Sequence, residues 1–163
     1  MLTKYLIVFL VSMLPLIELR GAIPISQLAS INIPLWQAYI IAVIGNMVPV
    51  PFIYLFARKI LVWGANKKWP KALNWLGRFF KFVLKKGEKG GKKITSKAKE
   101  GTFVALMLFV GIPLPGTGAW TGTLAASILD MDFKKSVIAI LLGVLLAGII
   151  MALISFGVFD LLF

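Results

Sequence analysis

The sequence contains no cysteine and no histidine, and only 6 of its 163 residues are acidic. Without cysteine the chain can form neither a disulfide framework nor a thiolate metal site. Without histidine it lacks the commonest general base and a frequent metal ligand. Most soluble enzyme chemistries are therefore excluded or strained, and we expect a protein that is not an enzyme and uses no metal or cofactor.

Apolar residues make up most of what is present. Hydrophobic residues are 60% of the chain, charged residues are 15%, and the mean hydropathy is +0.93. This apolar share exceeds the roughly 45–50% of ordinary soluble domains. The composition predicts a single membrane domain, residues 1–163. The apolar run after Lys4 could be a signal peptide, but charged Glu18 and Arg20 follow it instead of a cleavage site, so we expect this region to stay in the fold.

Positive charge is concentrated in the middle of the chain. The net charge is +12, and residues 57–100 account for all of it, with 14 Lys and Arg against two Glu. In a soluble protein such a block indicates nucleic-acid binding. Between apolar spans it instead favours the cytoplasmic side of a membrane and contact with anionic lipid. We therefore expect no nucleic-acid partner.

Two apolar runs, at about 33–57 and 136–159, are long enough for the roughly 20 helical residues that cross a bilayer. Two others, at about 5–31 and 102–129, are interrupted by proline, glycine and polar residues. Each half of an interrupted region spans only about 20 Å, at about 1.5 Å per residue. These regions predict helices broken at membrane depth. The expected hairpin-break residues are Pro15, Gly21, Pro24, Pro113 and Pro115.

The two halves match weakly when one is shifted by 98 positions, which aligns Pro15 with Pro113, Leu16 with Leu114, Asn32 with Asp130 and Gly45 with Gly143. Both halves have the same order: broken segment, short polar turn, long span. Lys134 and Lys135 lie on the same side as the basic segment only if the broken regions are re-entrant, which the positive-inside tendency favours. The repeats then have inverted topology, a layout common in secondary transporters.

The sequence thus predicts an all-α integral membrane fold of two inverted repeats in the inner (cytoplasmic) membrane. Each repeat is a re-entrant broken-helix hairpin followed by one transmembrane helix. A basic amphipathic cytoplasmic linker, residues 61–100, joins them. A homodimer would close the cavity of so small a chain.

The linker contains the stretch "KKWPKALNWLGRFFKFVLKK", in which apolar residues recur at spacings of four and three while basic residues fall seven apart. This pattern is typical of a helix lying in the headgroup plane, and a calmodulin-like partner is the alternative. The apolar positions are Trp69, Leu73, Leu76, Phe80 and Val83. The residues expected at the membrane surface are Trp69, Lys71, Arg78, Lys81 and Lys85.

Glu18 and Arg20 lie in the first break. A charge near the bilayer centre is costly unless paired or hydrated, so both should face the protein interior or a water-filled cavity. A direct pair needs the backbone to leave the helix between Pro15 and Gly21, because residues two apart on a helix do not face each other. One interpretation is structural, with the pair neutralised or tying down the hairpin tip. The other assigns Arg20 to an anion, since guanidinium forks onto phosphate oxygens, and Glu18 to proton coupling.

The second break, "GIPLPGTGAWTG", has no charge but many hydrogen-bond donors. Backbone amides near Gly116 and Gly118 and the hydroxyls of Thr117, Thr121 and Thr123 could bind an anionic headgroup, helped by a helix amino terminus. The alternative is that its small residues allow close helix packing.

Three further polar residues lie near the long spans. Asn46 is at mid-depth in the first span, where it either lines the same cavity or hydrogen-bonds across helices. Asp130 and Asp132 precede the second span and are expected to cap it.

The stretches "ELRGAIP" and "PLPGTGAWTG", with the basic linker between them, resemble the family of putative small multidrug export proteins over nearly the whole chain. This resemblance implies an inner-membrane transporter. More distantly, the hairpins resemble the DedA (SNARE-associated, VTT-domain) superfamily. That resemblance implies two hairpins meeting at mid-membrane and proton-driven transport of lipid phosphates, with Glu18 and Arg20 as the acid and base of the first hairpin. Residues 111–123 contain no arginine, which DedA proteins have in their second hairpin.

Three hypotheses for the function remain. The first is a proton-coupled, flippase-like transporter of an amphiphilic anion such as a polyprenyl or other lipid phosphate. The second is a small multidrug exporter of cationic amphiphiles, which Glu18 suits and Arg20 does not. The third is a non-transporting membrane scaffold whose basic helix recruits anionic lipid or a partner.

Overall fold

The computed structural model describes residues 2–68, 70, 73–79, 81–82, 85 and 99–162. This part of the chain is helical and contains no strand, which confirms the all-α prediction. The helices are α1 (Leu2–Met13), α2 (Glu18–Ser26), α3 (Leu35–Met47), α4 (Pro49–Asn66), α6 (Lys99–Gly111), α7 (Ala119–Ile128) and α8 (Phe133–Leu162).

Two helical stretches are long and apolar enough to cross a membrane, Leu35–Asn66 and Phe133–Gly157. Both begin within a few residues of the predicted spans, although the first continues nine residues beyond the predicted end at position 57. Large apolar side chains on their surfaces are exposed, as expected where a helix faces lipid. Examples more than 45% exposed are Ile40, Ile44, Phe52, Phe56, Leu153 and Phe156.

The first long stretch is interrupted between α3 and α4, where the sequence predicted one continuous span. Pro49 and Pro51 have no backbone N–H, so the carbonyls of Gly45 and Met47 lose their usual helical partners. Val48 between the two helices keeps helical φ and ψ angles of −56° and −47°. The interruption is therefore a local loss of hydrogen bonds within a continuing helical path.

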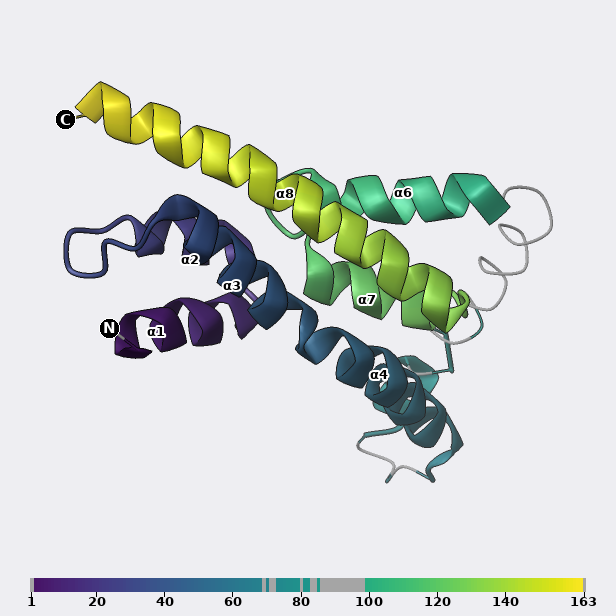
Figure 1. Ribbon diagram of the computed structural model, residues 1–163. Helices are drawn as coiled ribbons and strands as arrows, with labels where there is room; N and C mark the ends of the chain where they lie inside the picture. Colours follow the sequence, from purple (N-terminus) through teal and green to yellow (C-terminus); the bar gives the residue numbers. More distant parts are fainter. Residues whose placement is uncertain are drawn as a thin grey trace.

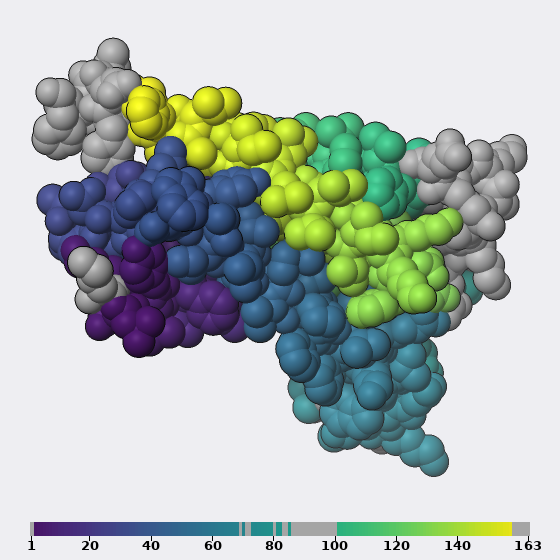
Figure 2. All heavy atoms as spheres, in the orientation of Figure 1, coloured from purple at the N-terminus to yellow at the C-terminus, as the bar shows by residue number. Residues whose placement is uncertain are grey.

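The same order of elements occurs twice, and the two halves pack reciprocally (Figure 1). Helix α1 packs on α3, and α6 packs on α8. The return helix of each half crosses to the other half: α2 packs on α8, and α7 packs on α4. On the face shown in Figure 2, α8 lies between α3 and α6. The contacts between the return helices and the opposite long helices hold the halves together.

Glycines at matched positions permit the closest contacts within each half. A Cβ on Gly45 would lie 2.6 Å from the carbonyl oxygen of Phe9, and a Cβ on Gly143 would lie 2.6 Å from that of Met107. These two contacts are related by the same shift of 98 positions. Asn32 and Asp130 also share a left-handed backbone, with φ of 43° and 55°. The internal match thus corresponds to shared geometry, while the inverted, re-entrant placement in a membrane stays a prediction.

The connections 14–17 and 112–118 separate the two short helices of each half. Pro15, Pro113 and Pro115 lie in these connections. Gly21 and Pro24, which the sequence analysis placed at the first break, lie instead inside α2. Pro24 is tolerated there because it removes only one amide donor, two residues before the helix ends.

Helix α4 is fixed to the turn between α7 and α8. The Tyr54 hydroxyl donates to the Met131 carbonyl, Arg58 forms an ion pair with Asp130, and the Ser127 hydroxyl donates to the Tyr54 carbonyl at 2.9 Å. Of the two aspartates expected to cap α8, only Asp132 does so, accepting from the Lys135 amide at 2.9 Å. Asp130 binds Arg58 instead.

Within the linker, residues 74–79 are helical, as are 81–82 and 85. Trp69, Lys71, Phe80 and Val83 lie outside the described residues. Arg78, Lys81 and Lys85 are exposed. Three aromatic side chains beside the predicted apolar face are also 55–60% exposed, namely Trp75, Phe79 and Phe82. The membrane-surface role of this segment stays a prediction.

Candidate functional site at the helix breaks

The first break meets the second break at the start of α2. The turn at 14–17 ends at Glu18, whose φ of 51° is in the left-handed region and turns the chain into α2. Leu19, Ala22 and Ile23 of α2 are fully or almost fully buried in the core. This anchoring places Glu18 and Arg20 against the connection between α6 and α7.

Glu18 caps the amino terminus of α7. Its side chain is buried, with the residue 4% exposed, and its two carboxylate oxygens accept from the amides of Ala119 at 3.3 Å and Trp120 at 3.1 Å. A carboxylate at this end satisfies amides that have no partner within the helix and faces the positive end of the helix dipole. The capping residue of α7 itself, Gly118, contributes no side-chain hydrogen bond. Glu18 thus supplies the cap from the other half of the molecule.

Gly118 makes this approach possible. Its φ is 146°, in the region that side-chain-bearing residues rarely adopt, and a Cβ at this position would overlap the Glu18 carboxylate. The carboxylate therefore occupies the space that a side chain would otherwise fill.

Arg20 binds the opposite kind of helix end. Its guanidinium donates to the carbonyls of Leu114 at 2.6 Å, Val110 at 3.3 Å and Ile112 at 3.3 Å, and to the Thr117 hydroxyl at 2.9 Å. These acceptors lie at the carboxyl end of α6 and in the turn after it, where a cation is favoured. Arg20 is half-buried. The carbonyls of Ile112 and Leu114 also accept from the amides of Leu114 and Thr117, so Arg20 adds a charged donor to a turn that is already hydrogen-bonded.

Thr117 and Trp120 complete the contact between the two breaks. The Thr117 hydroxyl lies 2.9 Å from the carbonyls of both Ile112 and Leu114, which closes the turn that Arg20 binds. The indole N–H of Trp120 donates to the Met13 carbonyl at 3.1 Å, at the carboxyl end of α1. Each break therefore satisfies free backbone groups of the other.

Glu18 and Arg20 form no salt bridge with each other; both use their charges on backbone groups. The structure brings together Glu18, Arg20, Thr117 and Gly118, as predicted from the sequence. The backbone partners of the two charges were missed, because nothing in the sequence says which distant amides and carbonyls remain free. The second glycine of "PGTGAW", Gly118, was the one sign in the sequence that another group approaches the backbone closely here.

None of the other expected site residues is hydrogen-bonded to Glu18 or Arg20 in the described part of the chain. The Thr121 hydroxyl donates to the Gly118 carbonyl at 3.4 Å. Thr123 is fully buried, and its hydroxyl donates to the Ala119 carbonyl. Gly116 has a φ of 81° and no atom within 4 Å of the position that a Cβ would take. Asn46 is fully buried in α3, and neither its amide nitrogen nor its amide oxygen has a hydrogen-bond partner. The hydrogen bond across helices that was one expectation for Asn46 is thus not formed.

The described residues contain no group of three or more Cys, His, Asp or Glu side chains able to hold a metal. Comparison with curated proteins and with solved structures finds no match. A family match covers residues 18–150, which begins at Glu18 and includes Arg20, the second break and most of α8. Because it spans most of the sequence, the chain belongs to the family described as "Putative small multi-drug export protein".

Proposed function

We propose that this chain is a membrane transporter whose substrate site is the contact between the two helix breaks. The family name supports transport. The observation that carries the proposal is the pair of opposite charges, Glu18 and Arg20, held between two broken helices in a body whose outer surface is apolar. Intramembrane charges on interrupted helices mark ion and substrate paths in transporters.

The proposed substrate is an amphiphilic anion, such as a polyprenyl or other lipid phosphate. Arg20 is half-buried, and all its acceptors are uncharged oxygens. Phosphate oxygens form stronger, charge-assisted bonds to guanidinium than carbonyls do, so a phosphate can compete for Arg20. The open space beside Gly116 leaves room for a headgroup next to the Arg20–Thr117 contact.

Glu18 is the proposed proton-coupling group. As a carboxylate it holds the amides of Ala119 and Trp120. Protonation removes the charge that faces the positive end of α7 and weakens both bonds. The two breaks could then separate, and proton binding would thereby be linked to movement of the halves.

The proposed placement is a re-entrant hairpin from each half, in inverted orientation, in the cytoplasmic membrane. It is supported by the arrangement in Figure 1, where the start of α1 and the α2–α3 loop lie at one end of the molecule. The start of α6 and the α7–α8 turn lie at the other end. Lys134 and Lys135 are in the first turn of α8, and the basic linker leads into the start of α6 in the sequence. That end would be cytoplasmic.

The second candidate is export of cationic amphiphiles, which the family name favours. In that case Glu18 would bind the cation. It would first have to leave the amides of Ala119 and Trp120, while Arg20 nearby repels the ligand.

Transport across proteoliposomes under an imposed pH gradient tests these alternatives. The purified protein is assayed with a fluorescent polyprenyl phosphate and, separately, with ethidium. We expect lipid-phosphate movement by the wild type, strong loss in Arg20→Ala, partial activity in Arg20→Lys, and loss of the pH-gradient dependence in Glu18→Gln. Arg58→Ala, which removes a cation from an ion pair outside the site, is the matched control and should transport normally.

Each of the other outcomes excludes at least one of the functional hypotheses. Ethidium movement that depends on Glu18 alone contradicts the anion transporter and supports the drug exporter. If folded protein moves neither probe, both transport hypotheses are wrong and the scaffold hypothesis is favoured. Circular dichroism and gel filtration of each variant separate loss of transport from loss of the fold.

A further inference from the structure

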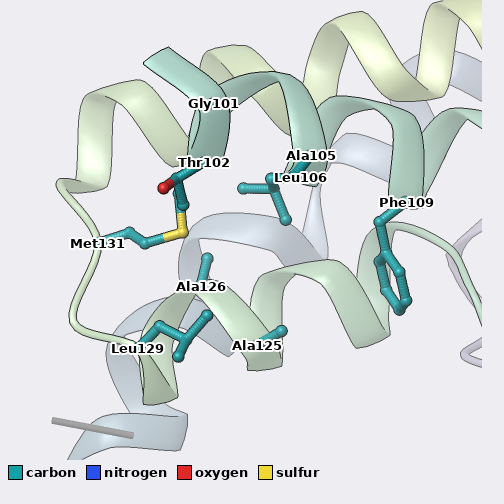
Figure 3. A pocket seen from close by; sticks show the side chains of 9 residues that line it. All are labelled: Gly101, Thr102, Ala105, Leu106, Phe109, Ala125, Ala126, Leu129 and Met131. Carbon is teal, nitrogen blue, oxygen red and sulfur yellow. The ribbon is translucent and has the colours of Figure 1, made fainter. Parts of the chain in front are cut away.

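A groove between α6 and α7 is open to the surroundings (Figure 3). Gly101, Leu129 and Met131 lie at one end, which we call the mouth, and Phe109 lies at the other end. The cavity volume is about 400 Å³, within the roughly 300–1,000 Å³ typical of ligand sites. Its lining is almost wholly apolar, so the occupant must be apolar where it lies in the groove.

The groove exists because α6 and α7 touch at one end and diverge toward the other. Near the break, Gly122 lets Val110 approach so closely that a Cβ on Gly122 would lie 2.5 Å from the valine side chain. Toward the mouth the facing residues are small, notably Ala105 and Ala125. The equivalent helices of the first half, α1 and α2, pack against each other more extensively.

The length and the lining of the groove fit one hydrocarbon chain. From Gly101 to Phe109 the lining runs along nine residues of α6, about 12 Å at about 1.5 Å per residue. An extended hydrocarbon chain can lie along this length, and it has no polar group that the apolar lining would leave without a hydrogen-bond partner. A helix of a second copy is the alternative occupant, and the experiment below distinguishes the two.

Positive charge lies next to the mouth. Three residues after Met131, the chain enters the first turn of α8 with Lys134 and Lys135, both exposed and without an ion pair in the described part of the chain. The two nearby acidic side chains already have partners, since Asp130 pairs with Arg58 and Asp132 caps α8. In the sequence the basic linker leads directly into α6, whose first turn lies at this end of the groove.

We propose that the groove holds one acyl chain of an anionic membrane phospholipid, whose phosphate is bound by Lys134 and Lys135. The inference rests on the membrane placement proposed above but not on transport. The lipid is a structural ligand that fills the wedge between α6 and α7, at the opposite end of the groove from Arg20. Its headgroup lies at the membrane surface, where basic residues attract anionic lipid.

Native mass spectrometry of the full-length protein in detergent tests the inference. The protein is incubated with equal amounts of phosphatidylglycerol and phosphatidylcholine of the same chain length, and bound lipid is counted. We expect the wild type to retain one phosphatidylglycerol. Ala105→Phe, which fills the groove, should lower binding of both lipids about tenfold, since it excludes two or so methylenes. Val104→Phe, on an exposed position of the same helix outside the groove, should bind as the wild type does.

The headgroup is tested separately. Replacing both lysines, Lys134→Gln with Lys135→Gln, should lower phosphatidylglycerol binding by more than about fivefold and leave phosphatidylcholine binding unchanged. Lys4→Gln, at the other end of the molecule, is the charge control. If Ala105→Phe does not fold, Ala125→Leu fills the groove with a smaller change.

Equal lipid retention by the Ala105 and Val104 variants, or no preference for phosphatidylglycerol in the wild type, overturns the proposal. A lipid-free wild-type dimer that Ala105→Phe converts to monomer also overturns it and assigns the groove to a second copy. A protein that keeps phosphatidylglycerol but moves no substrate contradicts only the transporter proposal. One that transports but binds no phospholipid contradicts only this one.

Discussion

Glu18 accepts a hydrogen bond from the backbone amide of Trp120 at 3.1 Å, although the two residues are 102 positions apart. This contact places a carboxylate of the first half at the amino end of a helix in the second half. Arg20 places a positive charge of the first half at the carboxyl end of α6. One turn of α2 therefore satisfies both helix ends that the second break exposes, and each charge faces the helix end whose dipole favours it.

The capping role predicts the effect of neutralising Glu18. Glu18→Gln keeps one acceptor oxygen but loses the charge and the second acceptor. We expect the free energy of unfolding to fall by about 1–2 kcal/mol, the usual range for a lost helix cap. Thermal unfolding in detergent measures it. The comparison is Asp130→Asn, which neutralises the acid of an exposed ion pair and should lower the free energy of unfolding by less than about 1 kcal/mol. A Glu18→Gln variant that melts with the wild type would show that the carboxylate does not stabilise α7.

Gly118 predicts a larger effect than its neighbour Gly116. Gly118→Ala must place a Cβ where the Glu18 carboxylate lies, at a backbone φ of 146°. We expect a loss of about 2–3 kcal/mol from backbone strain together with the displaced cap. At Gly116 the φ is 81° but the space for a Cβ is open. Gly116→Ala should therefore lower the free energy of unfolding only by the backbone strain, about 1 kcal/mol. Equal melting temperatures for the two variants contradict the close approach.

The matched glycines test the internal repeat. Gly45→Ala and Gly143→Ala each bring a Cβ to 2.6 Å from a carbonyl oxygen of the first helix of the same half. Both should lower the free energy of unfolding by similar amounts, about 1–3 kcal/mol, because the helices must move apart. Gly157→Ala, with nothing within 4 Å, is the control and should not destabilise the protein. A large loss in only one of the two variants contradicts equivalent roles for the halves.

The sequence was sufficient for the parts of the fold that depend on composition and local breaks. Long apolar runs gave the two long spans, and Pro15, Pro113 and Pro115 marked the two connections. The prolines were misjudged in two places: Pro24 stays inside α2, where it removes one amide donor near the helix end, and Pro49 and Pro51 interrupt the hydrogen bonds of a span predicted to be continuous. The partners of Glu18 and Arg20 are backbone groups about 100 positions away, and no side-chain pattern encodes them.

Asn46 predicts opposite effects on stability and on transport. Its side chain is fully buried, and its amide nitrogen and oxygen have no hydrogen-bond partner. A buried amide without partners costs about 1–3 kcal/mol, so Asn46→Leu, similar in volume, should raise the free energy of unfolding by about that amount. Retention of so costly a residue is explained if Asn46 gains a partner in another conformation of the transport cycle. The variant should then melt at a higher temperature and transport more slowly.

Val43→Leu, a buried apolar change one turn earlier on α3, controls for altered packing. If Asn46→Leu is destabilised, the amide already has a partner in the resting state, such as water, and the proposed change of partner is wrong.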